Sequence, residues 1–165
     1  MSITVTLTIE CDAAPVDEPR IRSAIERILA DAEVPSAQIG IAVLSDAAIR
    51  QLNRQYLNHD YATDVISFVL ESSQDHLEGE IAVSAETARR EAARLGWRAD
   101  DELLLYIVHG ALHLVGEDDT SAAGSQRMRH RERSVLAEFG LVPPWEAHQA
   151  SPRGRGKQSR EEWTR

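Results

Sequence analysis

The chain has 165 residues, of which 42% are hydrophobic and 27% charged, and its formal net charge at pH 7 is −9. This length suits one domain with a full core, and the composition is ordinary for a soluble globular protein. The negative charge argues against nonspecific nucleic-acid binding over the whole surface. The single cysteine, Cys11, excludes an internal disulfide and a cysteine-rich zinc site.

The sequence also predicts where the protein works. No apolar run approaches the roughly 20 residues of a membrane span. Residues 1–10 lack the basic and apolar regions of a signal peptide, and one cysteine fits a reducing compartment. We therefore expect a cytoplasmic monomer with no membrane segment.

The hydrophobic pattern predicts a series of elements along the first half of the chain. Residues 3–9 alternate between apolar side chains and threonines, which is typical of a strand with one buried face. Helical spacing at 17–32 predicts the first helix, and 38–44 a second strand. Ser45 is a typical N-cap for a second helix. The short apolar run at 65–70 predicts a third strand.

The second half begins with a predicted fourth strand at 79–83. The polar loop before it, 71–76, is too short for a helical crossover, so the third and fourth strands should form a hairpin. Ser84 caps a third helix that ends at Gly96. The fourth helix begins at Asp100, and because it is apolar on most sides it should run through the interior.

The chain ends in a charged helix at 125–139 and a tail rich in glycine, proline, arginine and serine. We interpret most charges of this helix, Glu132 among them, as a solvent-exposed face. The order βαβαββααα predicts an α+β fold, in which helices pack on one mixed four-stranded sheet. The expected organisation is one domain at 1–146 and a disordered basic tail at 147–165.

Two histidines four residues apart, His109 and His113, lie within the predicted interior helix. Because this spacing makes them neighbours on one helical face, both imidazoles can bind one metal ion. Gly116 can end the helix and turn the acidic residues 117–119 towards them, and any of these can supply a third ligand. Two histidines and one carboxylate leave a position for water, as in catalytic zinc sites. Gly110 stands where a zinc peptidase of the His-Glu-x-x-His type has its general base, which disfavours that class.

Three blocks of sequence resemble, in the right order, the signatures of one known family. Residues 109–119, HGALHLVGEDD, resemble HGxLHLxGYDH; residues 52–56 and 63–68, LNRQY and TDVISF, resemble LNxxYR and PTDVLSF; and residues 79–83, GEIAV, resemble GDIxI. These are signatures of the YbeY family of bacterial rRNA maturation factors. The resemblance implies a zinc-hydrolase-like fold and a single-strand-specific, metal-dependent endoribonuclease. Its expected role is maturation of the 3′ end of the small-subunit (16S) rRNA, together with ribosome quality control.

The resemblance assigns His109 and His113 as metal ligands and places Asp119 where the family has a third histidine. A carboxylate there still completes a site for one zinc ion, although the added negative charge makes occupancy by Mn or Fe more favourable. Asp118 is the rival ligand, and we interpret it as an acceptor that supports a histidine N–H. Either Asp118 or Glu117 is the expected general base.

The sequence departs from the family pattern at three other positions, which are Glu117 for a tyrosine, Ala62 for a proline and Leu57 for an arginine. In the family that arginine is expected near the metal, where it can hold a phosphate, and leucine cannot do this. Single-stranded RNA requires a positive groove, for which the candidate residues are Arg54, His59, Arg94 and Arg127.

The expected partners are single-stranded rRNA, the small ribosomal subunit and ribosome-associated proteins. Two other functions remain open. One is a metallohydrolase of another substrate, such as a peptide or a phosphoester, on the same scaffold. The other is a non-catalytic ribosome-assembly factor with a structural metal, which Leu57 makes more credible.

Overall fold

The structure, a computed structural model, describes residues 2–144, and its elements follow the predicted order βαβαββααα. The strands are β1 (Ser2–Ile9), β2 (Ser36–Leu44), β3 (Val65–Ser72) and β4 (His76–Ser84). The helices are α1 (Glu18–Asp31), α2 (Asp46–Leu57), α3 (Ala85–Leu95), α4 (Ala99–Leu114) and α5 (Ala122–Ala137). The predicted tail at 147–165 lies outside the described residues.

One sheet joins the strands in the order β1-β2-β4-β3. β2 pairs in parallel with β1 and β4, whereas β3 and β4 are antiparallel, which confirms the mixed sheet and the hairpin. The predicted loop at 71–76 is wrong in length, because β3 extends to Ser72 and β4 begins at His76. Polar side chains can continue a strand whose face is open to solvent, so the apolar pattern ends before the strand does.

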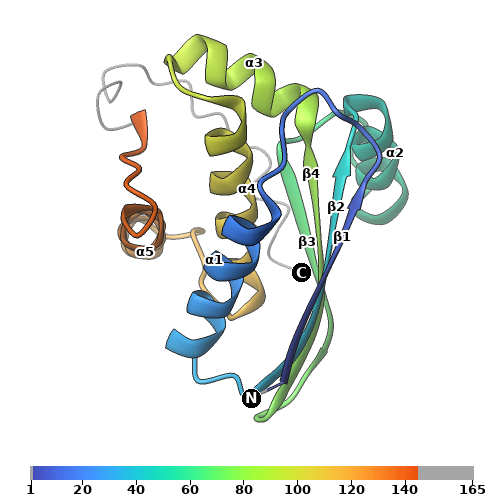
Figure 1. Cartoon of the computed structure of the whole chain (residues 1–165). Coiled ribbons are helices and arrows are strands. Elements are labelled where there is room, and N and C mark those ends of the chain that lie inside the picture. Colours follow the sequence, from blue (N-terminus) through green and yellow to red (C-terminus); the bar gives the residue numbers. More distant parts are fainter. Residues whose placement is uncertain (1, 145–165) are drawn as a thin grey trace.

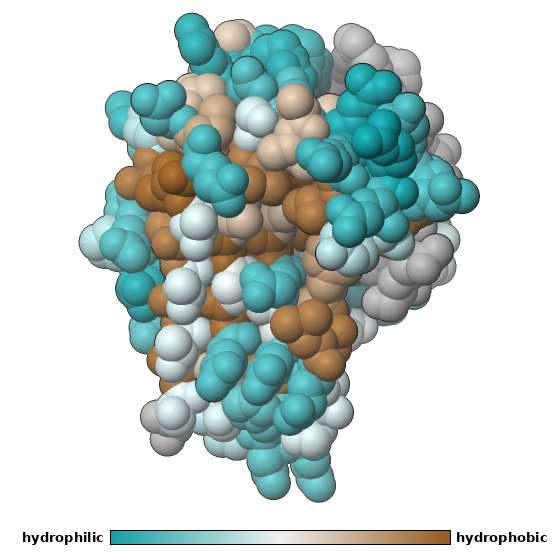
Figure 2. Space-filling view, turned by 90° about the vertical axis from the view of Figure 1, so that its right-hand side faces the viewer, coloured by the Kyte–Doolittle hydropathy of each residue, from teal (hydrophilic) through white to brown (hydrophobic). Residues whose placement is uncertain are grey.

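Helices cover the two faces of the sheet unequally (Figure 1). α1 and α4 pack on one face, with α5 outside them, and together they enclose the main core. α2 packs on part of the other face, where Ile49 and Leu57 contact Ile66 and Ala82. Figure 2 shows this second face, on which apolar surface gives way to hydrophilic residues at the lower end. These layers confirm the α+β fold.

Helix α4 runs through the interior, as predicted, and two glycines let it lie directly against β4. A Cβ atom on Gly110 would lie 2.9 Å from Cγ2 of Ile81, and one on Gly79 would lie 2.8 Å from Cδ2 of Leu114. The tight packing fixes the position and rotation of the helix, and so fixes the direction of its histidines. In the part of the chain from 2 to 144, no helix is both long enough and apolar enough to cross a membrane.

Helix α5 begins at Ala122, three residues before the predicted start. Ser121 caps it by accepting a hydrogen bond of 2.9 Å from the backbone N–H of Gly124. Gly124 is buried, and a Cβ atom there would collide with the backbone carbonyl of Asp118. The acidic segment after α4 is therefore packed closely on the first turn of α5.

Candidate metal centre

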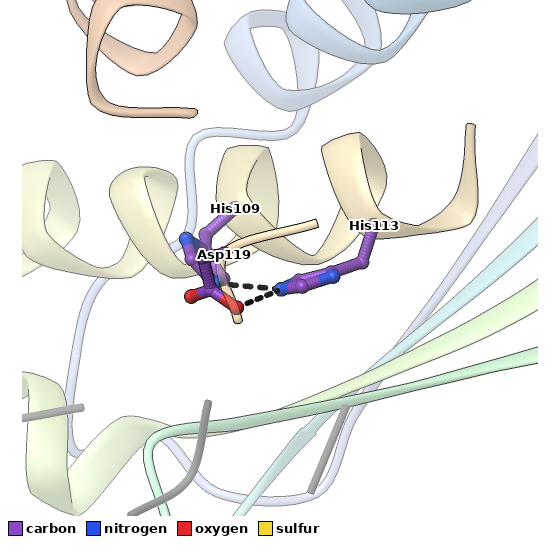
Figure 3. A group of neighbouring side chains, drawn as sticks. All are labelled: His109, His113 and Asp119. Carbon is purple, nitrogen blue, oxygen red and sulfur yellow. Dashed lines mark hydrogen bonds and ion pairs between the residues drawn. The ribbon is translucent and has the colours of Figure 1, made fainter. Parts of the chain in front are cut away.

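His109 and His113 project from the same face of α4 (Figure 3), as their spacing predicts. Their Nε2 atoms lie 3.1 Å apart, and the ring centroids are separated by 4.8 Å. His109 is only 2% exposed, and the side chain of His113 is 4% exposed. The Nε2 atoms of both imidazoles thus face one small space that solvent hardly reaches.

The chain turns back after α4 and brings an acidic side chain to this space. Gly116 adopts a φ of 101°, which favours glycine, and the backbone N–H of Glu117 donates to the carbonyl of Leu112 at 3.0 Å. The carboxylate of Asp119 then lies 3.7 Å from Nε2 of His109 and 3.6 Å from Nε2 of His113. The side chain of Asp119 is only 1% exposed, so all three groups are buried together.

The neighbouring carboxylate of Asp118 is directed elsewhere. One of its oxygens accepts a hydrogen bond of 3.0 Å from the backbone N–H of Thr120, and the other accepts one of 2.9 Å from the Thr120 hydroxyl. These bonds, the backbone one first, hold the pKa of Asp118 below its usual value. Asp118 is exposed and Glu117 half-buried, so Asp119 is the acidic residue that the loop turns inward.

A fourth residue, Glu132, completes the surroundings of His109. Its carboxylate on α5 contacts Nδ1 of His109, and its side chain is 0% exposed. The interpretation of Glu132 as part of a solvent-exposed face is therefore wrong. Glu132, and not Asp118 as we expected, is the carboxylate that supports a histidine ring nitrogen. The missed signal was its spacing, because Glu132 lies four residues from Met128 and three from Val135, on the buried face of α5.

The donor atoms suit a transition-metal ion. His109, His113 and Asp119 each offer one ligand atom, and these atoms all lie within 4.8 Å of one another. A tetrahedral ion with bonds of about 2.0–2.1 Å sets its ligand atoms about 3.4 Å apart, close to the spacings of 3.1, 3.6 and 3.7 Å found here. Buried imidazoles and a carboxylate converging in this way are the donor set of a metal site that retains a position for water.

Comparison with known proteins decides the family. Residues 6–140 match the family model described as Endoribonuclease YbeY. The chain belongs to the YbeY family. It is 37% identical to Endoribonuclease YbeY of Chloroherpeton thalassium over 137 aligned residues. The alignment covers 83% of this chain and 94% of that protein. It is 37% identical over 121 residues to the Desulfitobacterium hafniense protein of the same name, covering 67% and 77%.

A solved structure supports the same fold. A protein of Thermotoga maritima, studied in solution, has a TM-score of 0.60 and 22% sequence identity to this chain. The alignment covers 90% of this chain and 94% of that protein. The architecture expected from the YbeY resemblance is therefore found in the structure.

The structure also places the position at which the YbeY pattern has arginine. Leu57 is 4% exposed and is the last residue of α2, where it packs with Leu44, Ile49 and Ile66. It is an integral part of the small core on the α2 face of the sheet. The substitution therefore replaces a charged group by a core contact.

The four predicted RNA-binding residues lie on different elements. Arg54 is exposed in the last turn of α2, and the ring of His59, just beyond it, contacts the ring of Tyr61 edge to face. Arg94 on α3 pairs with Glu91 at 2.8 Å. Arg127 is exposed on α5, the helix that also carries Glu132. α2 and α5 flank opposite faces of the sheet (Figure 1), so these residues do not form one continuous groove.

Proposed function

We propose that this chain is a metal-dependent endoribonuclease that cleaves single-stranded RNA, with one metal ion held by His109, His113 and Asp119. The convergence of these three buried side chains carries the proposal. Membership of the YbeY family, in which relatives bear the name endoribonuclease, supports the choice of RNA as substrate. Zinc is the expected ion, and the carboxylate also makes the site suitable for Mn or Fe.

When bound, the ion supplies activation of a water molecule and polarisation of a phosphoryl oxygen. The residues of the chain prepare the site for this. The Glu132 carboxylate would accept a hydrogen bond from Nδ1–H of His109, which favours the tautomer whose Nε2 lone pair faces His113 and Asp119. Burial of all three ligands excludes bulk water and keeps them fixed in place.

A general base must take a proton from the attacking water. We assign this role to Glu117 rather than Asp118. Both oxygens of Asp118 already accept hydrogen bonds from Thr120, which directs this carboxylate away from the three ligands. Glu117 is half-buried and lies two residues before Asp119, whereas Asp118 is exposed.

The proposed setting is the cytoplasm, where a monomer acts on the 3′ end of the 16S rRNA within the small ribosomal subunit and takes part in ribosome quality control. Ribosome-associated proteins are the proposed partners. Arg127 is the proposed RNA contact on α5, the helix that also carries Glu132. Arg54, His59 and Arg94 would then bind parts of the RNA that extend beyond the site.

Cleavage assays test this proposal. Zinc- or manganese-loaded wild type should cut a labelled single-stranded RNA and leave the corresponding duplex intact. His113→Ala should reduce cleavage at least 100-fold, because one ligand is lost. His130→Ala is the matched control, since His130 is an exposed histidine on α5, and it should cut as well as wild type.

Two results would replace the proposal by another function. If the metal-loaded wild type sediments with small subunits but leaves single-stranded RNA intact, the protein is a non-catalytic assembly factor. The buried Leu57, which cannot hold a phosphate, favours this second candidate. If the protein degrades casein and leaves RNA intact, it is a hydrolase of another substrate.

A further inference from the structure

A second group of metal-ligating side chains lies on the β3–β4 hairpin. Glu71, His76 and Glu78 each offer one ligand atom, and these atoms all lie within 4.8 Å of one another. Gly79 and Ile81 face α4, and because side chains alternate along a strand, Glu78 lies on the opposite face of the sheet. The group is therefore separated from the candidate metal centre by the sheet itself.

A β-bulge brings Glu71 into this group. β3 and β4 pair with Val69 opposite Gly79, but the register then shifts, so that Glu71 lies opposite Glu78. In a regular ladder Glu71 would instead lie opposite Leu77, which is buried on the α4 face. Bulges commonly redirect one side chain at a functional position. Here the bulge places two carboxylates directly across from each other.

The imidazole of His76 is held towards these carboxylates. Its Nδ1 atom lies 2.7 Å from the hydroxyl of Ser36, the residue opposite it on β2, and its Nε2 atom lies 3.2 Å from Oε1 of Glu78. Metal-binding histidines are commonly oriented in this way, with one ring nitrogen bonded to the protein and the other on the metal. Ser36 thus sets the ring so that Nε2 faces the two glutamates.

The charges of the group favour a cation. Like charges directly opposite each other on neighbouring strands destabilise the pair, and Glu71 and Glu78 occupy such positions. A divalent ion between them offsets the repulsion, and one imidazole with two carboxylates is a suitable donor set for Zn²⁺ or Mn²⁺. We propose that Glu71, His76 and Glu78 form a second binding site for a divalent transition-metal ion, which links β3 to β4 beside the bulge.

This site differs from the buried centre in its access to solvent. Glu71 is exposed, and the side chains of His76 and Glu78 are 27% and 35% exposed. The hairpin lies at the end of the sheet far from α3 (Figure 1), and the second face is hydrophilic at its lower end (Figure 2). The ion can therefore exchange with solvent, and its expected role is to fix the hairpin rather than to assist cleavage.

Zinc titration calorimetry on the full-length, metal-stripped protein tests this proposal. Wild type should bind two equivalents of Zn²⁺. Asp119→Ala should keep the equivalent on the hairpin, and the double variant Asp119→Ala/His76→Gln should bind none. In the Asp119→Ala background, Ser36→Ala should weaken zinc binding about 10- to 100-fold, because the orienting hydroxyl is lost.

Glu80→Gln is the matched control for Glu78→Gln. Both glutamates lie on β4 and on the same face, but Glu80 lies over Gly40 rather than beside His76. Within the Asp119→Ala background, Glu78→Gln should abolish zinc binding and Glu80→Gln should leave it unchanged, with circular dichroism showing that both are folded. If Asp119→Ala alone already binds no zinc, or if His76→Gln and Glu78→Gln bind it as well as Glu80→Gln does, the second site does not exist.

Discussion

Glu132 and His109 are paired in the interior, although they belong to different helices and are 23 residues apart in sequence. The carboxylate contacts Nδ1 of the imidazole, and the second ring nitrogen, Nε2, faces His113 and Asp119. The pair also joins α4 to α5 beside the candidate metal centre. α5 therefore contributes a side chain to the surroundings of this candidate centre.

Glu132→Ala should weaken metal binding about 10- to 100-fold, the usual cost of losing a partner that orients a histidine ligand. Glu132→Gln should weaken it less, because the amide oxygen can still accept the Nδ1 proton. The measurement is zinc affinity by competition with a chelator. Glu138→Gln, at the exposed end of the same helix, is the control and should bind zinc as wild type does. Equal affinities for Glu132→Ala and Glu138→Gln would show that the pair does not support the metal.

Asp119 and Asp118 are adjacent but should differ sharply in their effect on the metal. Asp119→Ala removes a carboxylate that faces both histidines, so the purified protein should lose most of its zinc. Asp118→Ala removes hydrogen bonds to Thr120 only, so zinc content should stay near one equivalent at this centre. The measurement is zinc content by elemental mass spectrometry. All samples carry His76→Gln, which removes the proposed second site, so that only zinc at this centre is counted. A full equivalent of zinc in the Asp119→Ala protein would contradict the assignment of Asp119 as the third ligand.

Leu57→Arg restores the residue of the YbeY pattern but should destabilise the protein. Leu57 is 4% exposed in the small core beneath α2, and losing a buried leucine side chain costs about 2–5 kcal/mol. Urea denaturation should show this as a lower midpoint. Gln55→Arg adds the same charge at an exposed position of α2 and should leave the midpoint nearly unchanged. Equal midpoints for the two variants would mean that position 57 can turn its side chain to solvent.

Asp46 joins the start of α2 to α3 and should make stability depend on pH. Its carboxylate accepts hydrogen bonds from Ser84 at 2.6 Å, Thr87 at 2.7 Å and Arg90 at 2.6 Å. Burial acts to raise the pKa of Asp46, but these bonds outweigh it and lower the pKa below its usual value. Because the folded-state pKa is lowered, this stabilisation is fully present above the unfolded-state pKa of about 3.9 and is lost as pH falls through the folded-state value.

Asp46→Asn should therefore cost about 1–2 kcal/mol of unfolding free energy at pH 7, and the difference from wild type should shrink steadily below about pH 4. Thermal denaturation at a series of pH values measures both effects. Asp60→Asn is the control, because Asp60 pairs with Arg50 at the exposed surface, and it should be close to wild type. A difference for Asp46→Asn that persists unchanged at low pH would contradict this account.

The sequence by itself determined the order of the elements and the histidine pair. Alternation, helical spacing and capping residues are local signals, so they predicted the four strands and five helices found in residues 2–144. The spacing of His109 and His113 likewise placed both on one helical face. The family signatures are also local blocks of sequence. Polar residues obscured the ends of β3 and β4 and the start of α5, where solvent exposure or a cap replaces the apolar pattern.

Only the tertiary structure decided which acidic side chains lie beside the two histidines. The family signature favours Asp119 over Asp118 as the third ligand, but the direction of each side chain depends on the turn at Gly116 and the packing on α5, which leave Asp118 exposed and bring Asp119 to the histidines. The spacing of Glu132 from Met128 and Val135 indicates the buried face of α5, but its partner His109 belongs to another helix and cannot be found from that spacing. Such pairings depend on how α4 packs against β4 and α5. These elements are distant in sequence, so local sequence patterns do not encode the contacts between them.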